Sequence, residues 1–128
     1  MTIEKGEPRT VDDLFGGRGR VRVWSLLERF AEPFTAILSC ELAPSGSVGR
    51  HRQEEFPEVV VGLDGDGEAV VDGRPERLAP GDVVHLPLGS VLELRNRSEE
   101  HPLSYLIIKA RAQRGHEQRR SRRDQATR

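Results

Sequence analysis

The chain has 128 residues, of which 35% are hydrophobic and 32% charged, which predicts one domain with a single core. No apolar run approaches the roughly 20 residues that span a bilayer, and the first residues lack the apolar segment of a signal peptide. A single cysteine, Cys40, excludes a disulfide framework and a Cys-cluster zinc site. We therefore expect a cytoplasmic protein that makes no contact with membranes.

Charge is distributed unevenly along the chain. Residues 109–128 carry eight basic and two acidic side chains, a net charge of +6, whereas the remaining residues carry 12 basic and 19 acidic ones, a net charge of −7. An acidic body is not typical of a nucleic-acid-binding domain, so no nucleic-acid partner is expected. The basic tail could contact an anion or the acidic surface of the body itself.

The chain order predicts an N-terminal arm, a β domain and a tail. Residues 1–20 form the arm, whose glycine-rich end, residues 15–20, favours a flexible segment over a helix. The tail, residues 109–128, has no apolar stripe and is predicted to be frayed or disordered. Between them, residues 21–108 read as short strands separated by Gly, Pro and Asp turns, which predicts an all-β sandwich or small barrel. The expected strands are 21–27, 34–42, 58–63, 68–71, 83–86, 91–94 and 103–108.

Two sets of residues in this β region have regular spacing. The first set is His51, Gln53, Glu58 and Gly65, and the second is Gly81, Pro87, Gly89, Leu92 and Asn96. They resemble the two motifs of the cupin superfamily, H-x-H-x4-E-x6-G and G-x5-P-x-G-x2-H-x3-N, with Gln53 and Leu92 in place of histidines. The resemblance covers residues from about 24 to 108. It implies a cupin-type double-stranded β-helix, a jelly-roll barrel, from residue 21 to 108.

The resemblance also implies the location of a metal site. In cupins, three histidines and one glutamate from these positions hold a divalent metal inside the barrel. The corresponding candidate ligands here are His51, Gln53 and Glu58, because the hydrocarbon side chain of Leu92 cannot bind a metal. Two nitrogen donors are missing, so we expect at most a weakly held ion such as Mn, Fe, Zn or Mg. No organic cofactor is expected.

Glu58 and His51 are the candidate catalytic residues. A carboxylate inside an apolar barrel must meet a cation or take up a proton, and no inward Arg or Lys is apparent near Glu58. A protonated or half-protonated Glu58 would suit a general acid or base. For His51, the alternative to a catalytic role is a structural one, as a core histidine hydrogen-bonded to Glu58.

Further residues are candidates for lining the pocket. They are His85, Leu92, Leu94 and Asn96. For His85, strand alternation cannot be carried through the corner at Pro87, so an inward and an outward side chain both stay open.

Two functions follow from these residues and the resemblance. One is a small cupin enzyme, of a metal-assisted isomerase, epimerase, lyase or cyclase type or of a dioxygenase-like type, acting by proton transfer on a small polar or carbonyl-containing metabolite. The alternative is a non-catalytic small-molecule binder in which the metal site has been lost. A small barrel leaves an open strand edge, so we also expect a homodimer, which light scattering would test.

Overall fold

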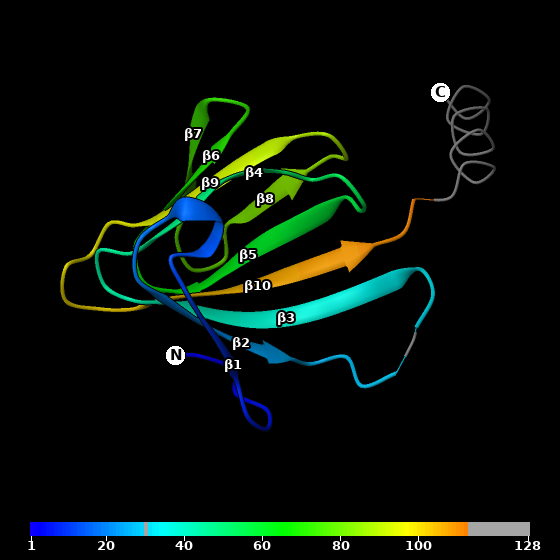
Figure 1. Ribbon diagram of the computed structural model, residues 1–128, viewed down its shortest axis with the longest axis horizontal. Helices are drawn as coiled ribbons and strands as arrows, with labels where there is room; N and C mark the ends of the chain where they lie inside the picture. The colour runs from blue at the N-terminus through cyan, green and yellow to red at the C-terminus, as the bar shows by residue number, and fades with distance from the viewer. Residues whose placement is uncertain (30, 113–128) are drawn as a thin grey trace.

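Short strands joined by tight turns make up the computed structural model, which describes residues 1–29 and 31–112 (Figure 1). Within these residues the helical structure is one short 3-10 turn, η1 (Leu14–Gly16), and no helix is long and apolar enough to cross a membrane. The strands are β1 (Arg9–Asp12), β2 (Arg20–Ser25), β3 (Phe34–Leu42), β4 (Ser47–Arg52), β5 (Glu58–Asp64), β6 (Gly67–Val71), β7 (Arg74–Leu78), β8 (Val83–Leu86), β9 (Val91–Asn96) and β10 (Leu103–Ala110).

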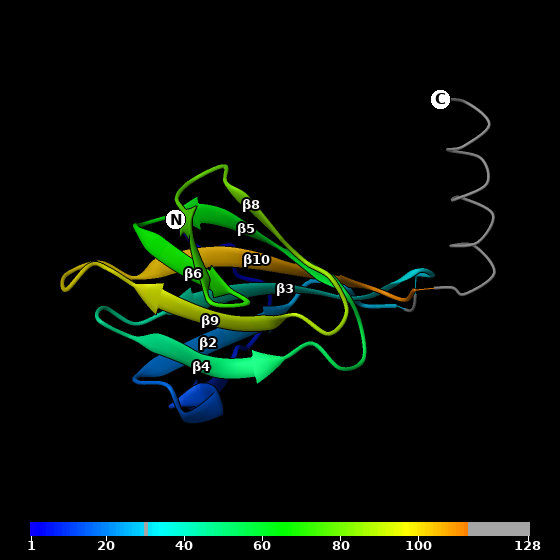
Figure 2. The same ribbon diagram turned by 90° about the horizontal axis from the view of Figure 1, so that it is seen from above.

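The strands form two antiparallel sheets. The larger sheet has the order β1-β2-β3-β10-β5-β8, and the smaller one has the order β4-β9-β6-β7. Figure 1 shows β2, β3, β10 and β5 in succession across the larger sheet, and the view from above in Figure 2 shows β4 and β9 of the smaller sheet side by side. Neighbours in space are often distant in sequence, as expected for a jelly roll. This arrangement confirms the predicted all-β, two-sheet barrel.

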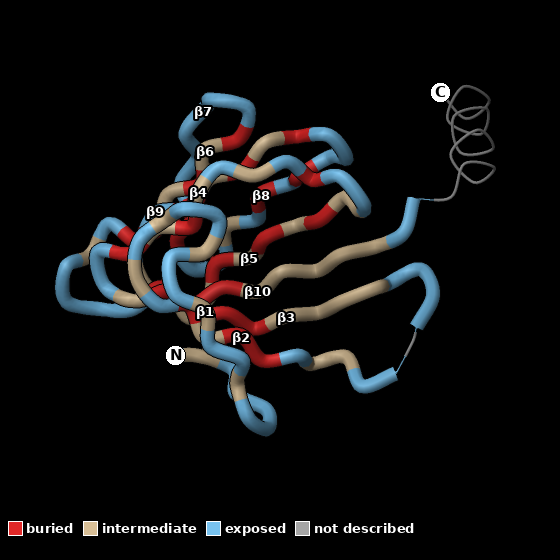
Figure 3. The backbone as a smooth tube through the Cα atoms, viewed as in Figure 1, coloured by how far each residue is buried: buried red, intermediate tan, exposed pale blue. Residues whose placement is uncertain are grey.

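The core lies between the sheets because alternate strand residues point inward. On β2 these are Val21 and Val23, and on β9 they are Leu92 and Leu94, each of the last two 1% exposed. Figure 3 shows buried segments on the facing strands of both sheets. On β3, Cys40 and Leu42 lie two residues apart and therefore on one face of the strand, and both belong to the core.

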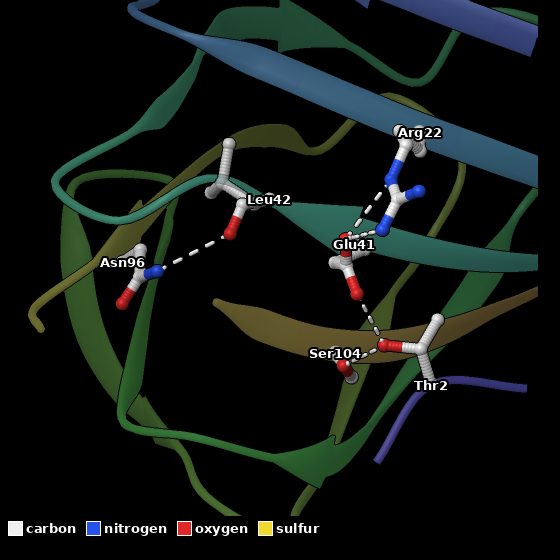
Figure 4. Close-up of polar contacts among 6 residues, drawn as sticks. All are labelled: Thr2, Arg22, Glu41, Leu42, Asn96 and Ser104. Atoms are coloured by element: carbon white, nitrogen blue, oxygen red, sulfur yellow. Dashed lines mark hydrogen bonds and ion pairs between the residues drawn. The ribbon is translucent and has the colours of Figure 1, made fainter. Parts of the chain in front are cut away.

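The predicted N-terminal arm contains regular structure. Strand β1 pairs with β2, with Arg9 opposite Val23, and the Arg20 side chain donates a hydrogen bond to Asp12 across the pair at 3.1 Å. Ahead of β1, Thr2 donates a hydrogen bond to Glu41 at 2.7 Å and contacts Ser104 (Figure 4). The sequence did not indicate β1, because an edge strand is held by backbone pairing and needs no alternating apolar face.

Strands β7 and β10 are among those that differ from the predicted ones. Strand β7 lies between the expected strands 68–71 and 83–86, where no strand was predicted, and four of its five residues are exposed. Pro75 fits there because β7 is an edge strand, where a missing backbone donor is tolerated. At the other end of the chain, β10 continues through Lys109 to Ala110, two residues beyond the predicted barrel. The rest of the predicted tail, from residue 113, lies outside the described residues.

Candidate ligand pocket between the sheets

A cavity of about 530 Å³ opens between the two sheets. The smaller sheet contributes side chains of β4 and β9, and the larger sheet contributes side chains of β1, β2, β3, β5 and β10. Leu14 and Phe15 of η1 complete one side. The cavity brings together five residues singled out from the sequence: His51, Gln53, Glu58, Leu92 and Leu94. Their roles in catalysis or metal binding remain predictions.

His51 is held in one orientation and one tautomer. Its Nδ1 atom lies 2.9 Å from the carbonyl oxygen of Gly49, and its ring stacks on Phe15 with 4.0 Å between ring centroids. A carbonyl only accepts hydrogen bonds, so Nδ1 carries the proton and donates it. Burial lowers the pKa of His51, and the nearby positive charge of Lys109 lowers it further, against the opposing effect of the Gly49 hydrogen bond. The neutral ring therefore has its lone pair on Nε2.

Gln53 lines the pocket and has an unused hydrogen-bond donor. Its backbone is fully engaged, because its N–H donates to the Ser90 carbonyl at 2.9 Å and its carbonyl accepts from Gly89 at 2.7 Å. The residue is 6% exposed, yet its Nε2 atom has no hydrogen-bond partner among the described residues. An unsatisfied buried donor costs roughly 1–3 kcal/mol, which is repaid if a ligand accepts from it.

Glu58 is the most buried carboxylate of the pocket, at 5% exposure. It begins β5, directly after Pro57, and its Cα pairs with Leu86 on one side and with Lys109 on the other. Burial raises the pKa of Glu58, and the positive charge of Lys109 partly opposes the shift. Within the described residues Glu58 forms no hydrogen bond or ion pair with another side chain.

The position of Lys109 shows that the expectation of no inward Arg or Lys near Glu58 was wrong. It lines the same pocket as Glu58, together with Tyr105 and Ile107 of the same strand. The sequence held a signal for it, because residues 105, 107 and 109 share a strand face once β10 is extended by two residues. Placing the end of the barrel at residue 108 assigned Lys109 to the tail and hid this alternation.

Cys40 and Tyr105 line the pocket and were not predicted as site residues. They are Cα partners on β3 and β10, and their side chains interact. Burial raises the pKa of the Cys40 thiol to about 12 and raises the pKa of the Tyr105 hydroxyl well above its usual value. Both groups therefore stay protonated near neutral pH, so Cys40 is not a reactive thiolate.

The structure places two of the predicted pocket candidates elsewhere. His85 is exposed on β8, where Val84 and Leu86 take the inward positions, so the outward alternative holds. Asn96 is buried but does not line the pocket. Its Nδ2 atom contacts three backbone carbonyl oxygens, those of Leu42 at 3.2 Å, Ala43 at 3.1 Å and His101 at 2.8 Å (Figure 4 draws the first). Asn96 therefore ties loops together.

The donors at the predicted metal position do not fit a firmly held ion. The described residues contain no group of three or more His, Cys, Asp or Glu side chains placed to hold a metal. The candidate set offers one imidazole, one carboxylate and one amide. Leu92, the Cα partner of His51 on the neighbouring strand, brings hydrocarbon to the position of a further donor. Two strong donors are fewer than transition-metal sites in proteins use.

Comparison with known proteins identifies the family. A family model described as "Cupin domain" matches residues 38–109, more than half of the chain, and the chain therefore belongs to the cupin domain family. The crystal structure of a predicted oxalate decarboxylase from Thermotoga maritima is similar, with a TM-score of 0.77 and 25% identity, and covers 83% of this chain and 93% of that one. A cupin 2 conserved barrel domain protein from Salinispora arenicola has a TM-score of 0.62 and 27% identity, with 84% and 87% coverage.

A curated protein also matches over part of its length. The endoribonuclease YbeY of Myxococcus xanthus is 39% identical over 62 residues, which is 48% of this chain and 21% of that protein. The chain thus spans about a fifth of that relative.

Proposed function

We propose that this chain is an enzyme that catalyses proton transfer on a small polar or carbonyl-containing metabolite, in an isomerase, epimerase, lyase or cyclase type of reaction. The observation that carries the proposal is Glu58, a buried carboxylate in the pocket wall with a raised pKa. A carboxyl group whose pKa moves toward neutrality can both donate and accept a proton near the operating pH, as general acid–base catalysis requires.

The other pocket groups have complementary roles in this proposal. The Nε2 lone pair of His51 accepts a hydrogen bond or a proton from the substrate, because the hydrogen bond to Gly49 holds the proton on Nδ1. The free Nε2 amide of Gln53 donates to a substrate oxygen and stabilises negative charge that develops there. Leu92 and Leu94 form an apolar wall that excludes water and sustains the raised pKa of Glu58.

A non-catalytic binder is the second candidate function. Leu92 favours it, because this residue brings hydrocarbon to a position where the related motif has a metal-binding histidine. The same pocket would then recognise a small molecule without transforming it.

Solvent exchange tests the catalytic proposal across several classes of substrate at once. A panel of small ketones, keto acids and hydroxy acids is incubated in D2O, and deuterium incorporation next to the carbonyl is followed by NMR. The protein is expected to accelerate exchange for one class, and Glu58→Gln is expected to lower that rate about 100-fold or more. Glu54→Gln, which alters an exposed carboxylate at the pocket rim, is the matched control. Saturable binding of a panel member without exchange would favour the non-catalytic binder.

The stability of the protein is expected to depend on pH through Glu58. Because burial raises its pKa in the folded state, the folded protein retains this proton to higher pH than the unfolded chain does. Stability therefore falls as pH rises from the unfolded pKa to the folded one, by about 1.4 kcal/mol per unit of pKa difference. Gln does not titrate, so Glu58→Gln should gain stability relative to wild type between about pH 4 and pH 8. Urea unfolding at both pH values measures this, and a relative loss at the higher pH would indicate a charged, paired Glu58.

Any divalent metal is expected to bind weakly. His51 and Glu58 would be its ligands, with Gln53 as a third contact, and a chelator should remove the ion at room temperature. Leu92→His restores an imidazole beside His51 and should raise zinc affinity at least tenfold by isothermal titration calorimetry. Leu94→His, on the same strand and in the same pocket but not paired with His51, is the matched control. Metal that remains stoichiometric after prolonged chelation would contradict this prediction.

A further inference from the structure

The pocket contains hydrogen-bond donors and cations that no described residue satisfies. The Nε2 atom of Gln53 and the Oγ1 atom of Thr35 are both buried without a hydrogen-bond partner. Lys109 and Arg9 also line the pocket, and neither forms an ion pair within the described residues. In contrast, Arg20 and Arg22, on the neighbouring strand β2, are paired with Asp12 and Glu41.

Thr35 and Lys109 both line the pocket, next to an irregularity in the pairing of β3 with β10. Ala36 pairs with Lys109 and Phe34 pairs with Ala110, so Thr35 is left as the extra residue of a β-bulge. A bulge redirects side chains and is frequent at barrel rims. Here it lets both Thr35 and Ala36 line the pocket beside Lys109.

The positive charge of Lys109 reaches into the centre of the site. It lowers the pKa of His51, Glu58 and Cys40, which come from three different strands. Arg9 of β1 is exposed but lines the same pocket, and its charge lowers the pKa of Cys40. The carboxylates that line the pocket besides Glu58 are Glu54 and Glu55, which are exposed, so water weakens their effect on the interior.

We propose that the pocket binds a small molecule carrying a carboxylate or phosphoryl group, held by the ammonium of Lys109 and the hydroxyl of Thr35, with Arg9 and the Gln53 amide as further donors. An anion supplies the acceptors that these groups lack, and charge-assisted hydrogen bonds of this kind are the strong ones. The inference rests on the proposed function only in taking this pocket as the ligand site.

The test is a binding titration at low ionic strength, followed by NMR chemical shifts of the pocket residues. The probes are malonate, inorganic phosphate and malonamide, the last being an uncharged counterpart of malonate. We expect malonate or phosphate to bind in the millimolar range or tighter and malonamide to bind at least tenfold more weakly. Preference between malonate and phosphate identifies the anionic group as carboxylate or phosphoryl.

Substitutions test which side chains contribute to the affinity for the anion. Lys109→Met should raise the dissociation constant at least tenfold, and Thr35→Val, which removes only the hydroxyl, should raise it severalfold. Lys5→Met removes the same charge from a surface ion pair with Glu28, outside the pocket, and should leave the affinity unchanged. Thermal melts check that each variant is folded.

Several results would overturn the proposal. They are equal affinity for malonamide and malonate, equal effects of Lys109→Met and Lys5→Met, and no binding of either anion at millimolar concentration. Failure of the anion-binding proposal can be distinguished from failure of the catalytic proposal. Glu58→Gln should abolish exchange but retain anion binding, so lost catalysis with intact binding rejects only proton transfer.

Discussion

Replacing Asn96 by Ala is expected to lower the free energy of unfolding by about 3 kcal/mol. The Asn96 amide contacts the carbonyl oxygens of Leu42, Ala43 and His101, and its Oδ1 atom accepts a hydrogen bond from the Ser98 backbone at 2.9 Å. Alanine removes all four contacts. The Ala43 carbonyl keeps a hydrogen bond from the Gly46 backbone N–H at 2.9 Å, but each group that is left buried and unsatisfied costs roughly 1–3 kcal/mol, reduced where water enters. Urea unfolding followed by the fluorescence of Trp24, the single tryptophan, measures the loss.

The Asn96 prediction has two internal controls. Ser98→Ala removes hydrogen bonds to the backbone of Glu100 and His101 that are exposed, and should cost less than about 1 kcal/mol. Ligand affinity should be unchanged in folded Asn96→Ala, because this side chain lies outside the pocket. A loss of under about 0.5 kcal/mol would mean that water replaces the amide at no cost.

Gly49→Ala is expected to destabilise the protein by about 2–3 kcal/mol or to detach η1 from β4. A Cβ atom at this position would lie 1.9 Å from the carbonyl oxygen of Phe15 and 2.9 Å from the backbone nitrogen of Gly17. These are backbone atoms, so the clash is relieved only by moving the segment itself. Because Phe15 stacks on His51, the movement would also expose the His51 ring.

One measurement and one control variant distinguish a detached segment from general destabilisation. Exposure of the ring should raise the pKa of His51 toward its usual value, since burial is what lowers it, and NMR titration of the imidazole reports this. Gly73→Ala is the control for backbone strain, because Gly73 has a φ of +82° but open space around its Cβ position. Its cost of about 1–2 kcal/mol is expected to leave the pKa of His51 unchanged. A Gly49→Ala protein with wild-type stability and His51 pKa would contradict this account.

Strand alternation and motif spacing were sufficient to predict the barrel and part of its site. Residues two apart on a strand share a face, so the inward positions of Cys40 and Leu42 follow from the local sequence. The same rule extended through β10 would have placed Lys109 in the pocket beside Glu58. That error came from ending the strand where the apolar residues end, although a strand that lines a polar cavity does not need an apolar inward residue at its mouth.

The sequence by itself determined the fold class, the family resemblance and the identity of the three central polar residues, His51, Gln53 and Glu58. These depend on local periodicity and on fixed spacing within adjacent strands. Only the tertiary structure decided which distant segments surround them: η1 stacks Phe15 on His51, β1 brings Arg9 to the pocket, and a bulge in β3 adds Thr35. The tertiary structure also decided that His85 points outward and that Asn96 joins loops through its hydrogen bonds. Such contacts arise from pairing and packing between segments far apart in the chain, and local alternation carries no information about them.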